Sequence, residues 1–224
     1  AACAVARAVS DLAGGRTEGR AVLFCGPGNN GGDGVAAARF LLEMGWEVRC
    51  VLVGKREKMS PDCREMERRL EQSGGKLEDF TDSDSQFAAW SLEADVMVDA
   101  LFGIGLNTDL RGDAVTAVQM MNTCGVPVVA VDIASGVEAD TGRVLGTAVN
   151  AAKTVTFTLP KAGHFVGKGG LCCGALEVVD IGIPADLVQR ESYPVTSVDR
   201  SRVSLPVRPR DAHKGDFGRV YILG

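Results

Sequence analysis

The sequence has little histidine, no regularly spaced cysteines and no long apolar run. Its two histidines lack HxxxH spacing, so a zinc site would be without its usual ligands. The seven cysteines are odd in number and contain no CxxC pair, which is typical of reduced thiols in a cytoplasmic protein. Since no stretch of about 18 consecutive apolar residues occurs, we expect neither a membrane span nor a membrane partner.

An excess of basic residues is also missing. The chain has 24 Lys and Arg against 29 Asp and Glu, a net charge of −5, and its basic residues are scattered. Nucleic acid is therefore not expected as the main partner. A length of 224 residues with 46% hydrophobic residues predicts one full domain with a real core, and leaves room for an attachment.

Apolar runs of strand length alternate with amphipathic stretches of helix length along most of the chain. The continuously apolar run at 127–133 is typical of a parallel strand buried on both faces. The pattern predicts an α/β fold, a three-layer, doubly wound and mostly parallel Rossmann-like sheet. The expected strands cover 21–25, 47–53, 77–80, 95–100, 127–133, 153–158 and 175–180; the expected helices cover 1–12, 34–44, 61–72, 85–92 and 114–122.

A glycine-rich turn follows the first expected strand. The turn GPGNNGGDG at 26–34 lies between that strand and a helix, where free backbone N–H groups and the helix dipole attract an anion. It also matches the dinucleotide pattern GxGxxG. However, the acid that this pattern expects after the second strand is missing. Asn29, Asn30 and Asp33 add more polar side chains than a phosphate cradle requires; Asx turns and helix capping are the alternative interpretation.

Two further polar clusters follow expected strands. Asp99 ends the strand at 95–100, and Asp132 to Ser135 follow the strand at 127–133. Ligands of doubly wound sheets bind beyond the carboxyl ends of the strands, so we expect both clusters to share a crevice with the glycine-rich turn. The alternative is that each aspartate only caps an adjacent turn. Asn30, Asp99 and Ser135 offer hard oxygen ligands with one formal charge, which suits a monovalent cation better than calcium.

Four motifs occur in the order found in one enzyme family. GPGNNGGDG (26–34), VDALFG (98–103), DIASG (132–136) and LPKAG (159–163) resemble the NAD(P)H-hydrate epimerases of the YjeF N-terminal domain family. These form the N-terminal half of bifunctional NAD(P)H-hydrate repair enzymes, and the resemblance covers about nine-tenths of the chain. It implies a homodimeric isomerase that interconverts the R and S forms of hydrated NADH and NADPH (NADHX and NADPHX) at C6 of the nicotinamide ring.

The resemblance also implies roles for individual residues. Asp132 and Lys161 are the expected catalytic residues, and a potassium ion is expected on Asn30, Asp99 and Ser135. Ala134 stands where the family usually has proline, which puts the affinity for the cation in doubt more than the fold. The residues expected to bind the substrate are Asn29, Asn30, Gly31, Gly32, Asp33, Gly103, Ile104, Gly105, Leu106, Asn107, Thr108, Asp109 and Asp132.

The composition changes after residue 180. Residues 181–207 carry three prolines and little periodicity, and are predicted to be an exit segment or linker. The string HKGDFGRVYILG at 213–224 resembles the start of the ADP-dependent NAD(P)H-hydrate dehydratase domain. We therefore expect the epimerase domain and its linker at 1–198 and a truncated dehydratase domain at 199–224, from a parent protein that is both isomerase and lyase.

Two other functions are alternatives to the expected reaction. Epimerisation at C6 needs a group that protonates the leaving hydroxyl and a group that activates the returning water. Asp132 can alternate between these tasks with help from Lys161. The GxGxxG pattern alone would fit a nicotinamide-dependent oxidoreductase, although the missing ribose acid counts against it. A binding module that kept the fold and lost catalysis is the third possibility, and the presence of both Asp132 and Lys161 counts against it.

Overall fold

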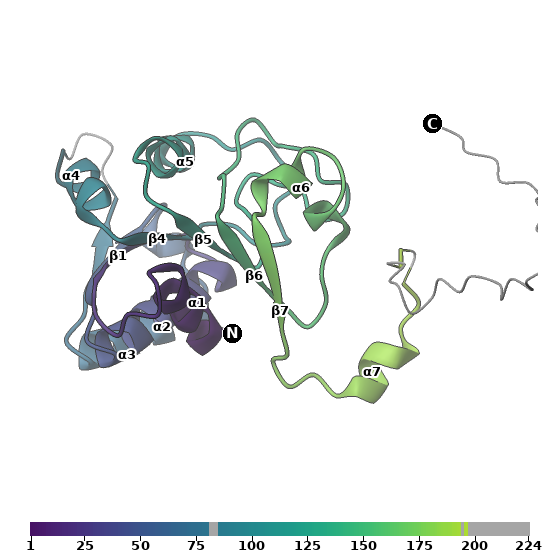
Figure 1. Cartoon of the computed structure of the whole chain (residues 1–224), viewed down its shortest axis with the longest axis horizontal. Coiled ribbons are helices and arrows are strands. Elements are labelled where there is room, and N and C mark those ends of the chain that lie inside the picture. The colour runs from purple at the N-terminus through teal and green to yellow at the C-terminus, as the bar shows by residue number, and fades with distance from the viewer. Residues whose placement is uncertain (81–84, 194, 197–224) are drawn as a thin grey trace, which may run out of the picture. The chain divides into compact units, whose positions relative to one another are not determined.

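The computed structural model describes residues 1–80, 85–193 and 195–196 (Figure 1). Its centre is a seven-stranded sheet with the order β3-β2-β1-β4-β5-β6-β7, and every pair of neighbouring strands is parallel. The predicted doubly wound α/β fold is confirmed. The strands are β1 (Arg20–Cys25), β2 (Glu47–Leu52), β3 (Leu77–Asp79), β4 (Val96–Ala100), β5 (Val128–Val131), β6 (Lys153–Phe157) and β7 (Ala175–Val179).

Helices cover both faces of the sheet (Figure 1). Three helices, α1 (Ala2–Leu12), α2 (Asn29–Glu43) and α3 (Pro61–Gln72), pack on one face; α4 (Ser85–Glu93) and α5 (Asp113–Thr123) pack on the other. The remaining helices are short: η1 (Arg56–Lys58), η2 (Ala162–His164), α6 (Gly169–Cys172) and α7 (Ala185–Arg190). None of the helices in the described part of the chain is long and apolar enough to cross a membrane.

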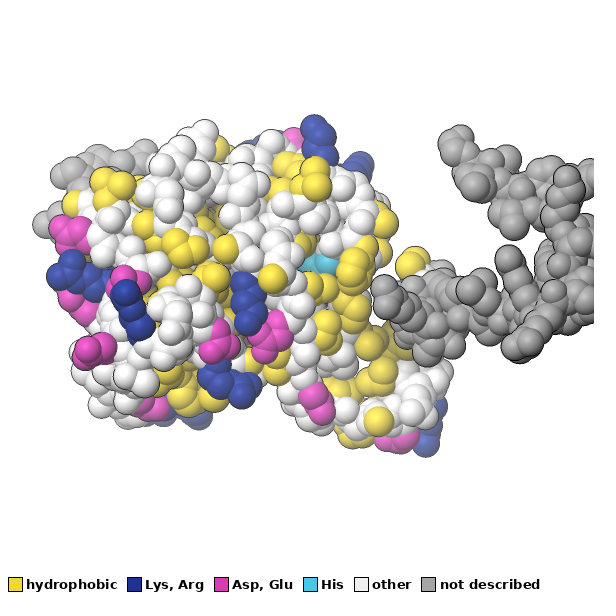
Figure 2. Space-filling view, in the orientation of Figure 1, with side chains coloured by type: hydrophobic (Ala, Val, Ile, Leu, Met, Phe, Trp, Pro, Cys, Tyr) yellow, Lys and Arg dark blue, Asp and Glu magenta, His cyan; other side chains and the backbone are white. Residues whose placement is uncertain are grey.

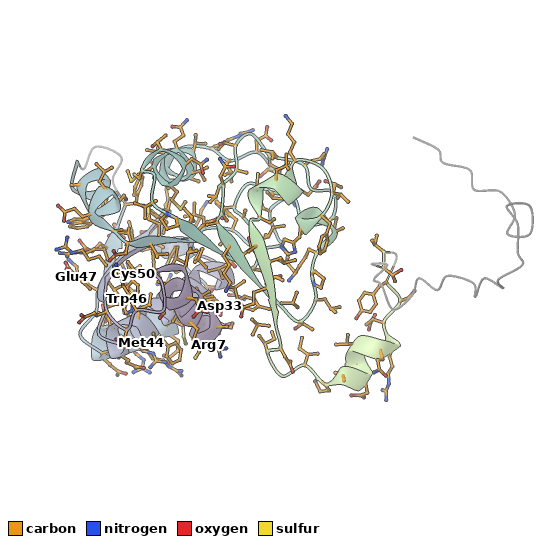
Figure 3. All side chains as sticks on the ribbon, in the orientation of Figure 1. Arg7, Asp33, Met44, Trp46, Glu47 and Cys50 are labelled. Atoms are coloured by element: carbon orange, nitrogen blue, oxygen red, sulfur yellow. The ribbon has the colours of Figure 1, made fainter. Side chains whose placement is uncertain are left out.

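The core has two layers, one on each side of the sheet. Alternate residues of β1 point to opposite faces, so Leu23 packs among α1, α2 and α3 while Phe24 packs toward α4 and α5. Figure 3 shows Trp46 and Cys50, two members of the first layer. Each fully buried Leu or Phe side chain stabilises the fold by about 1.5–3 kcal/mol. Burial on both faces explains why these strands are apolar without interruption.

The chain divides into two units, Ala1–Ala185 and Asp186–Gly224. The first contains the whole sheet. Within the second, the hydroxyl of Tyr193 donates a hydrogen bond to the carbonyl oxygen of Val188 (2.8 Å) at the end of α7. The stretch 181–207 is predicted to be an exit segment or linker, and the structure places the short helix α7 within it. The predicted dehydratase start at 199–224 lies outside the described residues.

The boundary of α2 is a second correction. The sequence predicts a helix from residue 34 because glycines are poor helix formers, but the helix begins at Asn29. Gly28 has an extended backbone (φ −85°, ψ −170°) and forms the N-cap, so the second half of the glycine-rich turn is the first turn of the helix. Asn29, Asn30 and Asp33 therefore project from a helix N-terminus and not from a loop.

Two neighbouring strands mark the reversal of the strand order. From β1 the chain runs outward to β2 and β3, then returns to β4 on the other side of β1 and continues to β7. Adjacent crossovers diverge at such a point and leave a crevice beyond the carboxyl ends of the strands. The fold thus directs a ligand to the edge where the glycine-rich turn and the loop after β4 lie next to each other.

The visible surface carries charges of both signs. Figure 2 shows Lys and Arg side chains beside Asp and Glu side chains across the described part of this face. Several charged side chains of the described chain are paired, among them Arg39 with Glu43 (2.5 Å) and Arg68 with Glu65 (2.7 Å). Exposed pairs of this kind contribute at most about 1 kcal/mol each, so the fold rests mainly on its core.

Candidate active site at the carboxyl edge of the sheet

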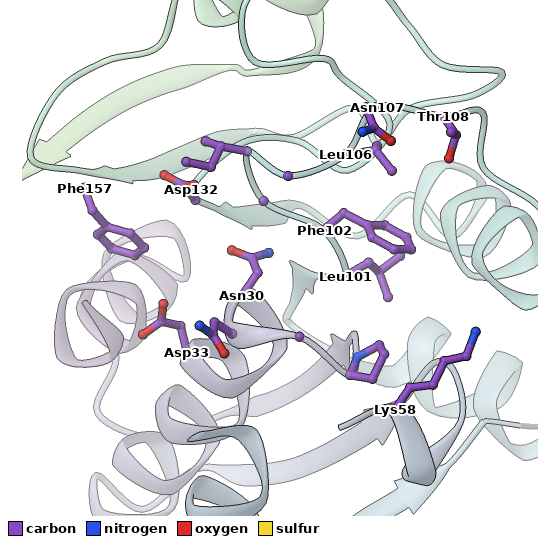
Figure 4. Close-up of a pocket in the computed structure, with 16 residues that line it drawn as sticks. Asn30, Asp33, Lys58, Leu101, Phe102, Leu106, Asn107, Thr108, Asp132 and Phe157 are labelled. Atoms are coloured by element: carbon purple, nitrogen blue, oxygen red, sulfur yellow. The ribbon is translucent and has the colours of Figure 1, made fainter. Parts of the chain in front are cut away.

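A cleft of about 750 Å³ lies beyond the carboxyl ends of the central strands (Figure 4). Its walls come from the glycine-rich turn, the loop after β4, the ends of β5 and β6, and η1, which follows β2. The size is within the range of small-molecule sites. The residues that line it are Pro27, Gly28, Asn29, Asn30, Asp33, Lys58, Leu101, Phe102, Gly103, Ile104, Gly105, Leu106, Asn107, Thr108, Asp132 and Phe157.

Two glycines allow the backbone segments at the cleft to approach closely. A Cβ atom at Gly26 would lie 2.0 Å from the carbonyl oxygen of Leu101, and one at Gly31 would lie 1.7 Å from the carbonyl oxygen of Gly26. Both distances are far below van der Waals contact. Any side chain at either position would therefore separate the turn after β1 from the loop after β4 or displace the start of α2.

Asn30 and Asp132 approach each other across Gly103. A Cβ atom at Gly103 would lie 3.2 Å from Oδ1 of Asn30 and 3.3 Å from Oδ2 of Asp132, so the two side chains flank the same backbone position. The Nδ2 atom of Asn30 is buried and has no hydrogen-bond partner within the described structure. Asp33 lies one turn further along α2, and burial raises the pKa of its carboxyl group, with a further rise from the negative charge of Asp132.

An ion pair lies at the end of the cleft formed by β5 and β6. The Nζ atom of Lys161 lies 2.6 Å from Oδ1 of Asp132, and both side chains are largely buried. Lys161 also donates to the hydroxyl of Thr156 (2.7 Å) and to the carbonyl oxygen of Phe157 (3.2 Å). The hydroxyl of Thr156 is 3.1 Å from the same carboxylate oxygen. These contacts hold the carboxylate and the ammonium in one fixed arrangement.

The backbone of Asp132 is in the left-handed region, with a φ of 67°. Aspartate tolerates this conformation better than most residues, but it still carries strain. The backbone N–H of Asp132 donates to the carbonyl oxygen of Val155 (2.8 Å), which extends the β5–β6 ladder by one bond. The left-handed turn then directs the carboxylate into the cleft and away from the sheet.

His164 contacts both members of the ion pair. Its Nδ1 atom accepts a hydrogen bond from the backbone N–H of Lys161 (3.0 Å), and its Nε2 atom lies 3.0 Å from the carbonyl oxygen of Asp132. The imidazole is buried. His164 is absent from the residues that the sequence predicts at the site, because nothing in a single loop histidine shows that it packs on a strand end 32 residues earlier.

A second polar cluster lies in the floor beneath the cleft. Asp99 is fully buried and accepts hydrogen bonds from the backbone N–H groups of Ser135 (2.7 Å) and Leu101 (3.2 Å) and from the hydroxyl of Ser135 (2.6 Å). Burial raises the pKa of Asp99 to about 6, although these hydrogen bonds act in the opposite direction. The hydroxyl of Ser135 also accepts from the backbone N–H of Phe102 (3.0 Å). Asp99 therefore caps a turn, as the alternative interpretation expected, and also joins the loops after β4 and β5.

The structure gathers most of the expected site residues at this edge. Asn29, Asn30, Asp33, residues 103–108 and Asp132 line the cleft, and Lys161 lies against Asp132. Gly31 and Gly32 are buried in the first turn of α2 and do not line the cleft. Asp109 lies outside the lining; its side chain is near Gly146.

Other lining residues are absent from the expected set. Leu101 and Phe102 follow β4, Phe157 ends β6, and Pro27 and Gly28 lead into α2. Lys58 enters from η1 and lies at the end of the cleft opposite Asp132 and Phe157 (Figure 4). The turn of η1 that brings Lys58 to the cleft is not visible in the sequence.

Comparison with known proteins agrees with the resemblance. Residues 1–163 match the family described as "YjeF-related protein N-terminus". The chain belongs to this family. A protein of known structure, the yeast protein ynu0 (YNL200c), superposes on this YjeF-related chain with a TM-score of 0.66 over 86% of each chain, at 22% sequence identity. That similarity concerns the fold alone.

Relatives of this YjeF-related chain have names that refer to hydrated nicotinamide nucleotides. The chain is 42% identical over 209 residues to the bifunctional NAD(P)H-hydrate repair enzyme of Moorella thermoacetica, which covers 92% of this chain and 39% of the relative. It is 38% identical over 164 residues to the NAD(P)H-hydrate epimerase of Oenococcus oeni, covering 73% of this chain and 75% of that protein. The chain thus spans about two fifths of the bifunctional relative.

Proposed function

We propose that this chain is an NAD(P)H-hydrate epimerase, which interconverts the R and S forms of NADHX and NADPHX. The observation that carries the proposal is the buried ion pair of Asp132 and Lys161, 2.6 Å apart at one end of a cleft of about 750 Å³. Loss and return of water at one carbon requires a group that gives a proton to the leaving hydroxyl and takes one from the returning water, and a buried carboxylate beside an ammonium is suited to this task. The name of the Oenococcus oeni relative supports the same activity.

The chemistry of the substrate explains this requirement. In the hydrate, C6 of the nicotinamide ring bears a hydroxyl group and is bonded to the ring nitrogen. The nitrogen lone pair can expel the hydroxyl group once it is protonated, which releases water and leaves an iminium ion. Water then adds to either face of C6 and gives up a proton, so the reaction consumes and returns one proton and changes no redox state.

Asp132 and Lys161 are the groups proposed to move this proton. Asp132 lies at the cleft surface, and its carboxylate takes the proton from the returning water and delivers it to the departing hydroxyl in the next cycle. Lys161 stabilises the carboxylate through its ammonium and is itself held by Thr156 and the carbonyl oxygen of Phe157. The apolar side chain of Phe157 lies at the same end of the cleft and limits access of bulk water to the ring.

A potassium ion is part of the proposal, and the residues present fit one. Asp99 and Ser135 supply buried oxygen atoms, and the amide oxygen Oδ1 of Asn30 lies beside Gly103. One carboxylate and neutral oxygens suit a monovalent cation. In the described part of the chain, no group of three His, Cys, Asp or Glu residues could hold a metal ion. The ion would supply positive charge close to the bound dinucleotide, and the three residues would tie α2 to the loops after β4 and β5.

The remaining proposals concern the protein around this domain. We propose a homodimer in the cytoplasm, and a parent protein that continues into an ADP-dependent dehydratase domain from residue 199. The family resemblance supports the dimer and the dehydratase domain, the cysteine pattern supports the cytoplasm, and the name of the Moorella thermoacetica relative supports a second activity in the parent. Light scattering after size-exclusion chromatography measures the first of them: a dimer has twice the monomer mass of 23.5 kDa.

The decisive experiment follows the two NADHX epimers by chromatography. Purified S or R epimer is incubated with the chain in potassium buffer, and the ratio of the two forms is measured over time. Accelerated relaxation to a mixture, with no change in redox state, is the expected result. A change in redox state would support the oxidoreductase, and dinucleotide binding without acceleration would support the binding module.

A further inference from the structure

We propose that His164 is a positioning residue, which as a neutral imidazole fixes the backbone of Asp132 and the backbone of Lys161 so that their side chains meet in the cleft. The inference rests on the proposed function for its catalytic consequence, and on the geometry of one ring for its structural part. The ring receives a hydrogen bond from Lys161 at Nδ1 and lies within hydrogen-bond distance of Asp132 at Nε2.

The partners of the two ring nitrogens determine the position of the proton. The backbone N–H of Lys161 can only donate, so Nδ1 of His164 must carry a lone pair. The carbonyl oxygen of Asp132 can only accept, so Nε2 must carry the proton. Only the neutral imidazole protonated at Nε2 satisfies both contacts. A second proton at Nδ1 would face the N–H of Lys161 and break that hydrogen bond.

The same ring restrains both halves of the ion pair. Asp132 has a positive φ, and its backbone is held by the N–H bond to Val155 on one side and by His164 at its carbonyl oxygen on the other. Lys161 is the N-cap of η2 and His164 is its third residue, so the hydrogen bond closes the turn that places Lys161. Loss of the ring would release the left-handed turn at Asp132 and the start of η2 together.

Burial, with a smaller contribution from the positive charge of Lys161, keeps His164 neutral near physiological pH. Burial lowers the pKa of the imidazole; the hydrogen bond to Asp132 opposes this, and the positive charge of Lys161 lowers it further. The carboxylate of Asp132 is the other charged group that acts on the ring, and the uncharged ring of Phe165 packs edge-on against it. A neutral histidine in contact with a lysine and an aspartate is suited to hold geometry without exchanging its own proton.

Two variants separate positioning from simple packing. His164→Gln retains an amide oxygen that can accept from Lys161 and an amide N–H that can donate to Asp132, whereas His164→Leu keeps bulk and loses both contacts. With NADHX epimers as substrate, we expect kcat of the Leu variant to fall on the order of 100-fold at a nearly unchanged KM, because a displacement of about 1 Å between reacting groups has an effect of this size. The Gln variant should recover part of kcat. Equal kcat for wild type and the Leu variant would overturn the proposal.

A spectroscopic measurement tests the structural part without any activity. Two-bond ¹H–¹⁵N correlations of the histidine rings identify the protonated nitrogen, and the chain has only two histidines, so the spectrum of His164→Gln assigns the signal. We expect a single neutral form protonated at Nε2 at pH 7. A doubly protonated ring or the Nδ1 form would refute the inference even if the chain is an active epimerase. An inactive wild-type chain that shows the Nε2 form would refute the proposed function and leave the positioning geometry standing.

Discussion

The ammonium of Lys161 lies 2.6 Å from the carboxylate of Asp132, and the two residues are 29 positions apart in the sequence. The pair is largely buried, so neither charge can be removed without consequence for the other. Loss of one partner from a buried pair destabilises a protein far more than loss of an exposed pair. For this reason the variants below retain size and hydrogen-bonding capacity wherever possible.

The variant Asp132→Asn tests the catalytic assignment. It keeps the shape of the side chain but removes the carboxylate that exchanges the proton, so we expect kcat for epimerisation to fall on the order of 10²–10⁴-fold while dinucleotide binding persists. Chromatography of the epimers measures kcat, and calorimetry measures binding. Asp140→Asn, at an exposed position, removes the same charge and should behave as wild type. Full activity in Asp132→Asn would contradict the mechanism.

The left-handed backbone of Asp132 predicts an unusual order of stabilities. Glycine adopts a φ of 67° without strain whereas alanine does not, so Asp132→Gly should unfold with a free energy roughly 1 kcal/mol higher than that of Asp132→Ala. Both variants lose the contact to Lys161, which therefore cancels in the comparison. Asp140, which is not among the residues with positive φ, should show the opposite order, and urea denaturation measures both pairs. Equal free energies of unfolding for Asp132→Gly and Asp132→Ala would mean that the left-handed turn at residue 132 relaxes in the alanine variant.

The lowered pKa of His164 predicts how stability depends on pH. A ring that resists protonation in the folded state stabilises the fold fully above the ordinary histidine pKa of about 6.5, and this contribution is lost as the pH falls through the lower value in the folded protein. The free energy of unfolding of the wild type should thus decrease more than that of His164→Gln between pH 8 and pH 5. Urea denaturation at each pH provides the values. Parallel curves for the two proteins would exclude a buried, neutral His164.

Lys58 lies at the end of the cleft opposite Asp132 and is proposed to contact a phosphate of the dinucleotide. A lysine that meets phosphate as an exposed point charge affects binding and not chemistry, so Lys58→Ala should raise KM several-fold at unchanged kcat. The effect should shrink at high salt because exposed charges are screened. Lys76→Ala is the matched control, since this exposed lysine precedes β3 at the other edge of the sheet. A reduced kcat in Lys58→Ala would show that Lys58 acts on the ring.

Exchange of potassium for sodium tests the proposed cation site. A ligand that binds only the folded state stabilises it, by roughly 2.7 kcal/mol at a concentration 100-fold above its Kd. We expect a higher Tm in potassium chloride than in sodium chloride at equal ionic strength. The difference should disappear in Ser135→Ala, which lacks one proposed ligand. A difference that persists in this variant would place the potassium effect elsewhere.

The sequence predicts the sheet well because the sheet is a local pattern. All seven strands occur at the expected positions, since a parallel strand buried on both faces is an apolar run such as Val128–Val131, which ends at Asp132. The positions of Asn30, Asp99 and Asp132 at one edge follow from the same pattern, because parallel strands place their carboxyl ends together.

The rest depends on contacts that no local pattern encodes. Helix α2 begins five residues before the expected position because Gly31 and Gly34 fit against neighbouring backbone and side chains where any Cβ would clash. Lys58 reaches the cleft through a three-residue turn, and η2 folds His164 back onto a strand end. Helices of three to six residues, such as η1 and α7, are too short to show periodicity.

The order of the strands determines how far the cleft extends across the sheet. The cleft extends from Lys58, after β2, to Phe157, at the end of β6, and passes β1, β4 and β5 on the way. Neighbouring strands lie about 4.8 Å apart, so the four intervals from β2 to β6 amount to roughly 19 Å, and the three intervals from β2 to β5, the strand that leads into Asp132, amount to roughly 14 Å. The distance between Lys58 and Asp132 therefore selects the length of the ligand. A dinucleotide can contact both residues at once, whereas a mononucleotide with the same hydrated ring is too short to reach both.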